Sequence, residues 1–173
     1  GLEINKENRR HINEIGINCV GAISELNNDK FDLITLNHVF EHLNDPINIL
    51  KDLQRHLKDD GLVIIEVPHA RDILLETFNL ESFKKFTLWS EHLILHTRKS
   101  LETFVLKSGL HTKKIEGYQR YPLSNHFNWL LNGKPSGHEI FHNLNSNDFH
   151  NHYSNFLNTI DQTDTLVGYF KKI

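Results

Sequence analysis

The sequence predicts an α/β fold: a doubly wound, mostly parallel sheet with helices on both faces and an antiparallel last strand. Two short apolar runs, Leu33–Leu36 and Leu62–Val67, are typical of strands that are covered on both faces. Helical patterns alternate with strands until about residue 121, an order that favours parallel βαβ units. The final run, residues 164–170, follows a helical segment and can therefore pair in the opposite direction.

Local signals mark where the elements begin and end. Asp45 can cap a helix whose first turn suits Pro46, and Thr97 can cap another that stops at Gly109. Turn chemistry at 58–61 ends the first of these helices. The other expected elements are helices over residues 6–15 and 150–160, and strands over 17–23, 113–121 and 164–170.

The bulk composition describes one ordinary globular domain of 173 residues, with 38% hydrophobic and 24% charged residues. A net charge of -3 gives no electrostatic reason to expect a nucleic-acid partner. The single cysteine, Cys19, cannot form an intramolecular disulfide. No apolar run approaches the roughly 20 residues of a membrane span. We therefore expect a single domain over residues 1–173, located in the cytoplasm.

Polar side chains follow both apolar strands at the point where each strand ends. Asn37 and His38 come directly after the first strand, Glu41 and His42 lie in the next turn, and His69 follows the second strand. Because ligands bind at the carboxyl ends of strands in open α/β sheets, we expect these side chains to share one crevice. They could act as general base, substrate clamp or metal ligands, and helix capping with solvation is an equally good interpretation of the cluster.

Two later segments also carry histidines. Glu91, His92 and His96 have the spacing of metal ligands, but 13 of the 173 residues are histidine and the zinc pattern His-Glu-x-x-His is missing, so we predict no metal site. Residues 120–138 mix aromatic and polar groups in a loop-rich region, which often builds a substrate wall or lid. The residues singled out there are Tyr121, His126, Trp129, Lys134 and His138.

Three segments, Phe31–Pro46, Lys58–Pro68 and Glu91–Leu110, together resemble class I S-adenosylmethionine-dependent methyltransferases, which have a Rossmann-like fold. Phe31–Pro46 resembles the fourth-strand motif of that family, and Lys58–Pro68 resembles the fifth-strand motif. Glu91–Leu110 is similar to the helix and turn that come next. A softer similarity links residues 120–138 to members that modify sugars and surface polysaccharides. The resemblance covers roughly residues 1–121, which we expect to form the core, with 122–160 as a helical insertion or lid and 164–173 as the last strand.

The resemblance implies S-adenosyl-L-methionine as cofactor and a small-molecule acceptor. It places Glu3 at the acidic residue that binds the ribose hydroxyls, and Asn37 and His38 beside the methionine and adenosine parts. Methyl transfer would be an in-line attack in which positioning is the main contribution, with His42 or His69 taking a proton from a hydroxyl acceptor. The residues implied are Glu41, His42 and His69 for catalysis and His92, His96, Tyr121 and His126 for substrate binding.

Two parts of that family's fold are missing from the sequence. They are the first strand and the glycine-rich loop that follows it and contacts the cofactor. The chain also lacks methionine and starts with what resembles the end of a strand, so we expect a fragment or processed product. Residues 1–26 should then repack, pair with another copy as a homodimer, or be poorly ordered. The alternative function is a non-catalytic binding or assembly module that keeps the methyltransferase scaffold.

Overall fold

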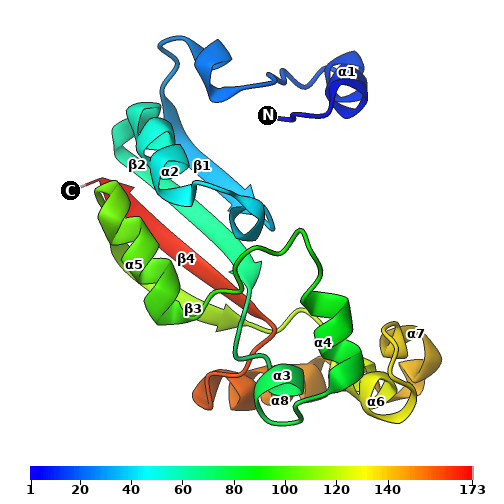
Figure 1. Cartoon of the computed structure of the whole chain (residues 1–173). Helices are drawn as coiled ribbons and strands as arrows, with labels where there is room; N and C mark the ends of the chain where they lie inside the picture. Colours follow the sequence, from blue (N-terminus) through cyan, green and yellow to red (C-terminus); the bar gives the residue numbers. More distant parts are fainter. Residues whose placement is uncertain (173) are drawn as a thin grey trace.

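Four strands form one mixed sheet in the order β1-β2-β4-β3 in the computed structural model, which describes residues 1–172 (Figure 1). β1 pairs parallel with β2, whereas β4 pairs antiparallel with both β2 and β3. Three strands therefore point the same way, and the predicted α/β fold with an antiparallel last strand is confirmed. The strands are β1 (Phe31–Asn37), β2 (Leu57–Pro68), β3 (Leu110–Tyr118) and β4 (Thr165–Lys172).

Helices occupy the connections between the strands. The longer ones follow local capping signals: Asp45 Oδ1 accepts the Asn48 N–H at 3.3 Å, Thr97 and Ser100 form a capping box, and Gly109 ends its helix with φ of 90°. The α-helices are α1 (Lys6–Glu14), α2 (Pro46–Arg55), α3 (Ile73–Glu76), α4 (Glu81–Thr87), α5 (Arg98–Ser108), α6 (Leu123–Asn132), α7 (Gly137–Ile140) and α8 (Asn147–Thr159). Short 3-10 helices are η1 (Ile23–Leu26), η2 (Phe40–His42) and η3 (His142–Leu144).

The helix expected at 150–160 begins earlier, at Asn147, and three further expected elements differ from the structure. The expected turn at 58–61 lies inside β2, where the register slips between the pairs Phe31–Leu57 and Leu33–Leu62, so the turn chemistry produces an irregularity within the strand. The strand expected at 113–121 is β3, which starts and ends three residues earlier. The expected strand at 17–23 is reduced to a single bridge between Leu2 and Val20.

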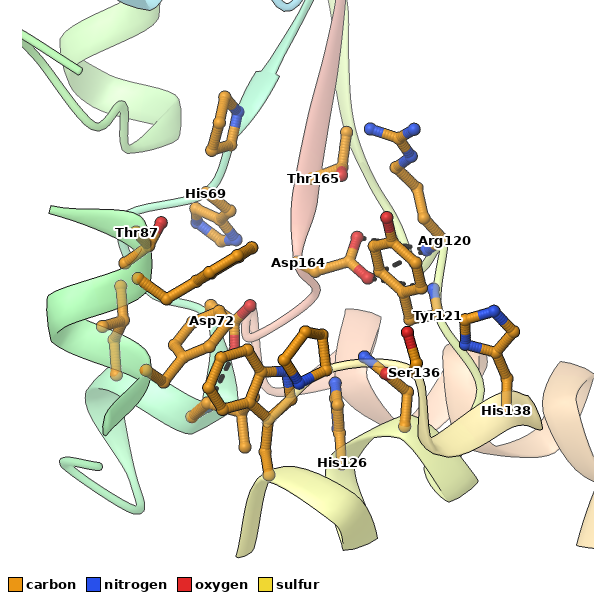
Figure 2. A pocket seen from close by; sticks show the side chains of 18 of the residues that line it. His69, Asp72, Thr87, Arg120, Tyr121, His126, Ser136, His138, Asp164 and Thr165 are labelled. Carbon is orange, nitrogen blue, oxygen red and sulfur yellow. Dashed lines mark hydrogen bonds between the residues drawn. The ribbon is translucent and has the colours of Figure 1, made fainter. Parts of the chain in front are cut away.

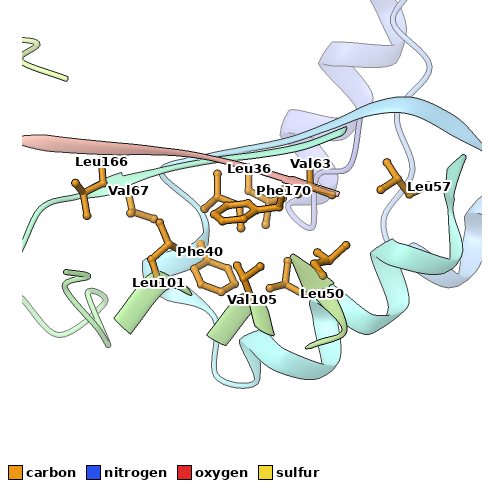
Figure 3. Packing of buried hydrophobic residues seen from close by; sticks show 12 residues of the cluster. Leu36, Phe40, Leu50, Leu57, Val63, Val67, Leu101, Val105, Leu166 and Phe170 are labelled. Atoms are coloured by element: carbon orange, nitrogen blue, oxygen red, sulfur yellow. The ribbon is translucent and has the colours of Figure 1, made fainter. Parts of the chain in front are cut away.

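The main core lies between the sheet and helices α2 and α5 (Figure 3). Val63, Ile65 and Val67 alternate along β2 and are all fully buried on this face. Leu50 of α2 and Leu101 of α5 pack against the same cluster. Burying each such side chain contributes about 1.5–3 kcal/mol, which ties the two helices to the sheet. The strand ends at the site are therefore held on a rigid support.

The N-terminal segment pairs with itself rather than with the sheet. Glu3 N donates to Val20 O and Val20 N donates to Gly1 O, each at 3.0 Å. Within residues 1–172, no backbone hydrogen bond joins residues 1–5 to β1. An apolar cavity of about 560 Å³ lies between this segment and β1 with α2.

The carboxyl ends of β1, β2 and β3 and the start of β4 meet at one edge of the sheet. Figure 1 shows this edge facing the helices α3, α4, α6, α7 and α8. A second, smaller apolar cluster joins α3, α6 and α8, made of Ile73, Leu74, Trp129 and Leu157. The helical region between residues 122 and 160 is thus placed directly over the strand ends. None of the helices within residues 1–172 has the length and apolar character needed to cross a bilayer.

Candidate functional site

A cavity of about 250 Å³ lies between the strand ends and the helical region (Figure 2). Seven of the residues singled out in the sequence line it, namely His38, His69, His92, Tyr121, His126, Trp129 and His138. Apolar side chains from three helices form one wall: Leu74, Leu75, Phe83, Phe86 and Trp129. The cavity therefore has an apolar side and a side rich in imidazoles, the general character of a small-molecule site.

His38 lies just after β1 among three charged side chains. Its Nε2 is 3.0 Å from Glu66 Oε1 and also contacts Arg120 Nη1, and its Nδ1 is 3.4 Å from Glu41 Oε1. The pKa of His38 is raised, chiefly by Glu41, although burial and Arg120 act in the opposite direction. With φ of 51°, His38 also has a left-handed backbone that is unusual outside glycine, and strain of this kind is typical of functional sites.

Glu41 and His42 form the 3-10 turn η2 behind His38. Glu41 is 1% exposed, and neither of its carboxylate oxygens has a hydrogen-bond partner among the described residues. His42 Nε2 lies 3.8 Å from Glu41 Oε1, while His42 Nδ1 lies 2.7 Å from the Glu91 carbonyl oxygen. The short turn thus presents a buried carboxylate and an imidazole side by side.

His92 comes to the same place from the irregular segment between α4 and α5. Its Nδ1 lies 2.7 Å from the Thr87 carbonyl oxygen, and its ring centroid is 4.9 Å from that of His42. The segment is fixed to η2 because Leu93 N donates to Glu41 O at 2.9 Å. His92 therefore connects the η2 cluster to the cavity that it lines.

His69 and His96 pair with each other in an isolated parallel bridge, and both are buried. His69 Nδ1 lies 3.0 Å from the Thr163 carbonyl oxygen, and burial lowers the pKa of His69. His96 instead packs between Phe40 and Phe104, and burial lowers its pKa to about 4. His69 faces the cavity, whereas His96 is a core residue absent from its lining.

The inner end of the cavity is a buried polar group. His126 Nδ1 lies 2.6 Å from Tyr153 Oη, and burial lowers the pKa of His126 to about 4. Burial raises the pKa of Asp72 to about 7, while the Leu74 N–H that its Oδ1 accepts acts the other way. His126 is thus a neutral, hydrogen-bonded residue of the cavity floor.

Three of the predicted catalytic, cofactor and substrate residues belong neither to the cavity lining nor to η2, the turn that holds Glu41 and His42. Glu3 belongs to the N-terminal segment, where its Oε1 accepts the Asn5 N–H at 2.7 Å. Asn37 is exposed at the end of β1, next to His38. His96 is the third. The structure brings together the residues around His38 and the cavity, and Glu3 stays outside that group.

Arg120 and Asp164 are site residues that the sequence analysis missed. Both line the cavity, and Asp164 accepts the backbone N–H groups of Arg120 and Tyr121 at 3.1 Å. The rule that placed Asn37 and His69 at strand ends did not find Arg120, because the strand expected from the sequence runs to residue 121, whereas β3 ends at Tyr118, two residues before Arg120. Asp164 precedes an antiparallel strand, so it reaches the same edge from the other direction.

Sequence comparison matches residues 2–114 to a family model described as "Methyltransferase domain". A ubiquinone biosynthesis O-methyltransferase from Haemophilus ducreyi is 27% identical over 110 residues, which cover 61% of this chain and 46% of that protein. The chain thus spans about half the length of that curated relative.

Two solved structures share the fold. One is a SAM-dependent methyltransferase from Archaeoglobus fulgidus, with a TM-score of 0.61 and 18% identity over 99% of this chain and 75% of that chain. The other, from Thermotoga maritima, is described as a SAM-dependent methyltransferase and possible histamine N-methyltransferase. Its TM-score is 0.64, with 15% identity over 100% of this chain and 72% of that one. With the family model covering more than half of its residues, the chain belongs to the methyltransferase domain family.

Proposed function

We propose that this domain takes part in S-adenosylmethionine-dependent methyl transfer to a small-molecule acceptor bound in the cavity at the strand ends. The observation that carries the proposal is the cavity itself, because a chain of this family presents a buried imidazole and an apolar wall in one cavity at that edge. The cofactor supplies an electrophilic methyl group on a positively charged sulfur.

The side chains near the strand end fit such a cofactor in their chemistry. Asn37 is exposed there and can both donate and accept hydrogen bonds. Glu3 Oε2 has no hydrogen bond within residues 1–172 and can accept from ribose hydroxyls, as its position in the family implies. These two residues, with His38 beside Asn37, are our proposed cofactor contacts.

His69 is the proposed general base. A carbonyl oxygen can only accept, so the 3.0 Å contact with Thr163 O places the proton of neutral His69 on Nδ1. Its Nε2 then carries the lone pair and has no hydrogen-bond partner among the described residues. Since burial lowers the pKa of His69, the ring stays neutral and ready to take a proton from an acceptor hydroxyl.

The acceptor is proposed to lie against the apolar wall with its reacting oxygen toward His69. Phe83 and Trp129 meet edge to face with ring centroids 5.0 Å apart, which gives the wall a fixed shape. Tyr121 and His126 border the same space. A sugar or surface-polysaccharide intermediate, with one apolar ring face and several hydroxyls, is our proposed acceptor class.

The location of the protein, the role of its helical region and its self-association are also proposed. A cytoplasmic location agrees with the single cysteine, and a small molecule rather than nucleic acid agrees with the net charge of -3. Residues 122–160 are proposed to act as the lid of the cavity. Self-association into a homodimer is proposed for the N-terminal segment.

The test uses the full-length protein. Isothermal titration with S-adenosylmethionine should show binding, and a panel of hydroxylated acceptors should include one that is methylated. His69→Asn keeps a donor for Thr163 O but removes the base, so kcat should fall roughly 10²- to 10⁴-fold while cofactor affinity stays unchanged. His11→Ala, on an exposed helix, is the matched control. Absence of cofactor binding would refute the proposal and support a non-catalytic module.

A further inference from the structure

Three side chains with metal-binding atoms meet beside the cavity: Glu41 and His42 from η2 and His92 from the α4–α5 connection. One donor atom of each lies within 4.8 Å of those of the other two. We propose that these residues bind a divalent transition metal, with Zn²⁺ as the ion that fits the donor set. Two imidazoles and one carboxylate are a common ligand set of zinc sites that keep one position open.

Backbone hydrogen bonds prepare both imidazoles for a metal. His42 Nδ1 lies 2.7 Å from Glu91 O, and His92 Nδ1 lies 2.7 Å from Thr87 O. Because a carbonyl oxygen only accepts, each Nδ1 carries the proton and each Nε2 is left with its lone pair. Metal-binding histidines are usually held in this way, with the second ring nitrogen donating to a carbonyl or carboxylate. Two independent carbonyls thus select the tautomer that a metal needs.

The buried carboxylate of Glu41 supports the same interpretation. Neither oxygen has a hydrogen-bond partner within the described residues, although the side chain is 1% exposed. A carboxylate buried in this way costs several kcal/mol unless a positive charge or donors approach it. His38 Nδ1 approaches Oε1 at 3.4 Å, a long contact, and Oε2 has no partner among the described residues. A bound cation would neutralise a carboxylate that otherwise has only the long His38 contact.

The distances allow a site that closes by a small movement. Glu41 Oε1 and His42 Nε2 are 3.8 Å apart, and ligand atoms about 2.0–2.2 Å from a tetrahedral ion stand roughly 3.4 Å apart. Movement of less than about 1.5 Å would bring all three donors to a common ion. The His42 and His92 rings are already adjacent, with Trp89 packed edge-on against both.

His92 also lines the acceptor cavity, so the site forms part of its wall. Three protein ligands leave a fourth position for water or an oxygen of a bound molecule. The inference goes beyond the proposed methyl transfer, because binding of the ion by these residues does not depend on which acceptor is used. The sequence spacing groups His92 with Glu91 and His96 as potential metal ligands, whereas the structure groups it with Glu41 and His42.

The test measures the metal directly. Protein treated with EDTA and desalted is titrated with Zn²⁺ by calorimetry, and its metal content after dialysis is determined by mass spectrometry. We expect one Zn²⁺ per chain. His42→Ala, His92→Ala and Glu41→Gln should each weaken binding by at least about tenfold, since even outer contacts to metal ligands have effects of that size. Co²⁺ in place of Zn²⁺ should give the visible absorption of a four-coordinate nitrogen and oxygen site.

A histidine-rich chain can bind metals at its surface, so the control is His11→Ala combined with His152→Ala, both exposed. This variant should keep the full affinity. His92 is only partly buried, and His92→Ala is therefore the variant expected to fold normally even if Glu41→Gln does not. Failure to bind one Zn²⁺, or an equal loss of affinity in the surface variant and in His92→Ala, would overturn the site. Neither result would bear on methyl transfer.

Discussion

Asp164 holds the backbone of Arg120 with both carboxylate oxygens, each 3.1 Å from the Arg120 nitrogen. Its Oδ2 also accepts the Tyr121 N–H at 3.1 Å and the Gln119 side-chain amide at 2.8 Å. Burial raises the pKa of Asp164, while the backbone N–H groups of Arg120 and Tyr121 act in the opposite direction. One carboxylate at the start of β4 therefore fixes the segment that leaves β3 and carries two cavity residues.

Replacing Asp164 should loosen this segment. Asp164→Ala leaves several donors without their acceptor, and we expect a loss of roughly 2–3 kcal/mol in the free energy of unfolding. Asp164→Asn retains one acceptor oxygen and should lose less. Urea denaturation measures both variants. Asp60→Ala removes an exposed carboxylate and should change the free energy of unfolding by less than about 0.5 kcal/mol. Equal effects of Asp164→Ala and Asp60→Ala would contradict the anchoring role.

Asp72 should make stability depend on pH in a defined direction. Its pKa is about 7 in the folded protein and 3.8 in the unfolded chain, so the folded state holds the proton more tightly. The contribution of Asp72 to stability is therefore lost as pH rises from about 4 to about 7. Asp72→Asn keeps the helix cap without the charge. Its stability advantage over the wild type should grow across that window, with an upper limit of about 4 kcal/mol.

Thermal or urea unfolding at pH 5 and pH 8 measures this difference for Asp72→Asn. Asp60→Asn supplies the matched control, because Asp60 is exposed. An advantage that is the same at both pH values would show that Asp72 is not held protonated by burial.

The parts of the fold that were predictable are those decided by neighbours in sequence. Helix starts at Asp45 and Thr97 depend on caps within three residues, and the buried strand before Pro68 depends on its own apolar run. The meeting of Arg120 with Asp164 depends on β4 lying between β2 and β3, which is a long-range pairing. Local patterns contain no information of that kind.

The grouping of histidines shows the same limit. The spacing of His92 and His96 predicts that they share one face of a helix. The segment between α4 and α5 is not helical, so the two rings separate. His96 enters the core against Phe40, and His92 lies beside His42 from a different part of the chain. Spacing predicts a shared face only where the backbone is regular.

The titration of His38 should respond in opposite directions to its two kinds of neighbour. Glu41 is the main cause of its raised pKa, so Glu41→Gln should lower that pKa. Arg120 acts against protonation, so Arg120→Ala should raise it. Because the folded pKa is raised, the stability that His38 contributes is present below pH 6.5 and is lost as pH rises through the folded value.

Nuclear magnetic resonance of the His38 ring protons, recorded on EDTA-treated protein, follows the titration of each variant. His152→Ala, far along the chain on α8 and exposed, should leave the His38 titration unchanged. Shifts of the same sign in the Glu41 and Arg120 variants would contradict the charge arrangement.

His96 should weaken the fold in acid. Burial lowers its pKa from 6.5 to about 4, so the unfolded chain takes up a proton more readily between these values. The contribution of His96 to the free energy of unfolding of the wild type therefore falls as pH drops from about 6.5 to about 4. His96→Leu removes this dependence and should gain up to about 3 kcal/mol relative to the wild type at pH 4. Unfolding at pH 4 and pH 8 gives the comparison, and His152→Leu should show no such gain.

Gly137 allows α7 to pack closely on α6. A Cβ at this position would lie 2.6 Å from Asn128 Cβ and 2.8 Å from Asn125 Cα, and would also meet the Ser124 carbonyl oxygen. These are backbone or near-backbone atoms that cannot turn away, so Gly137→Ala should cost about 1–3 kcal/mol by overpacking. It should also disturb Ser136 and His138, which line the cavity.

Gly16→Ala separates this steric effect from the conformational one. Gly16 has φ of 85° and no atom within 4 Å of an added Cβ, so its substitution costs only backbone strain, about 1 kcal/mol. Urea denaturation should rank Gly137→Ala as more destabilising, and acceptor binding should weaken in Gly137→Ala alone. If Gly16→Ala weakened acceptor binding as much, the effect could not be assigned to α6–α7 packing, because Gly16 lies in the N-terminal segment away from the cavity lining.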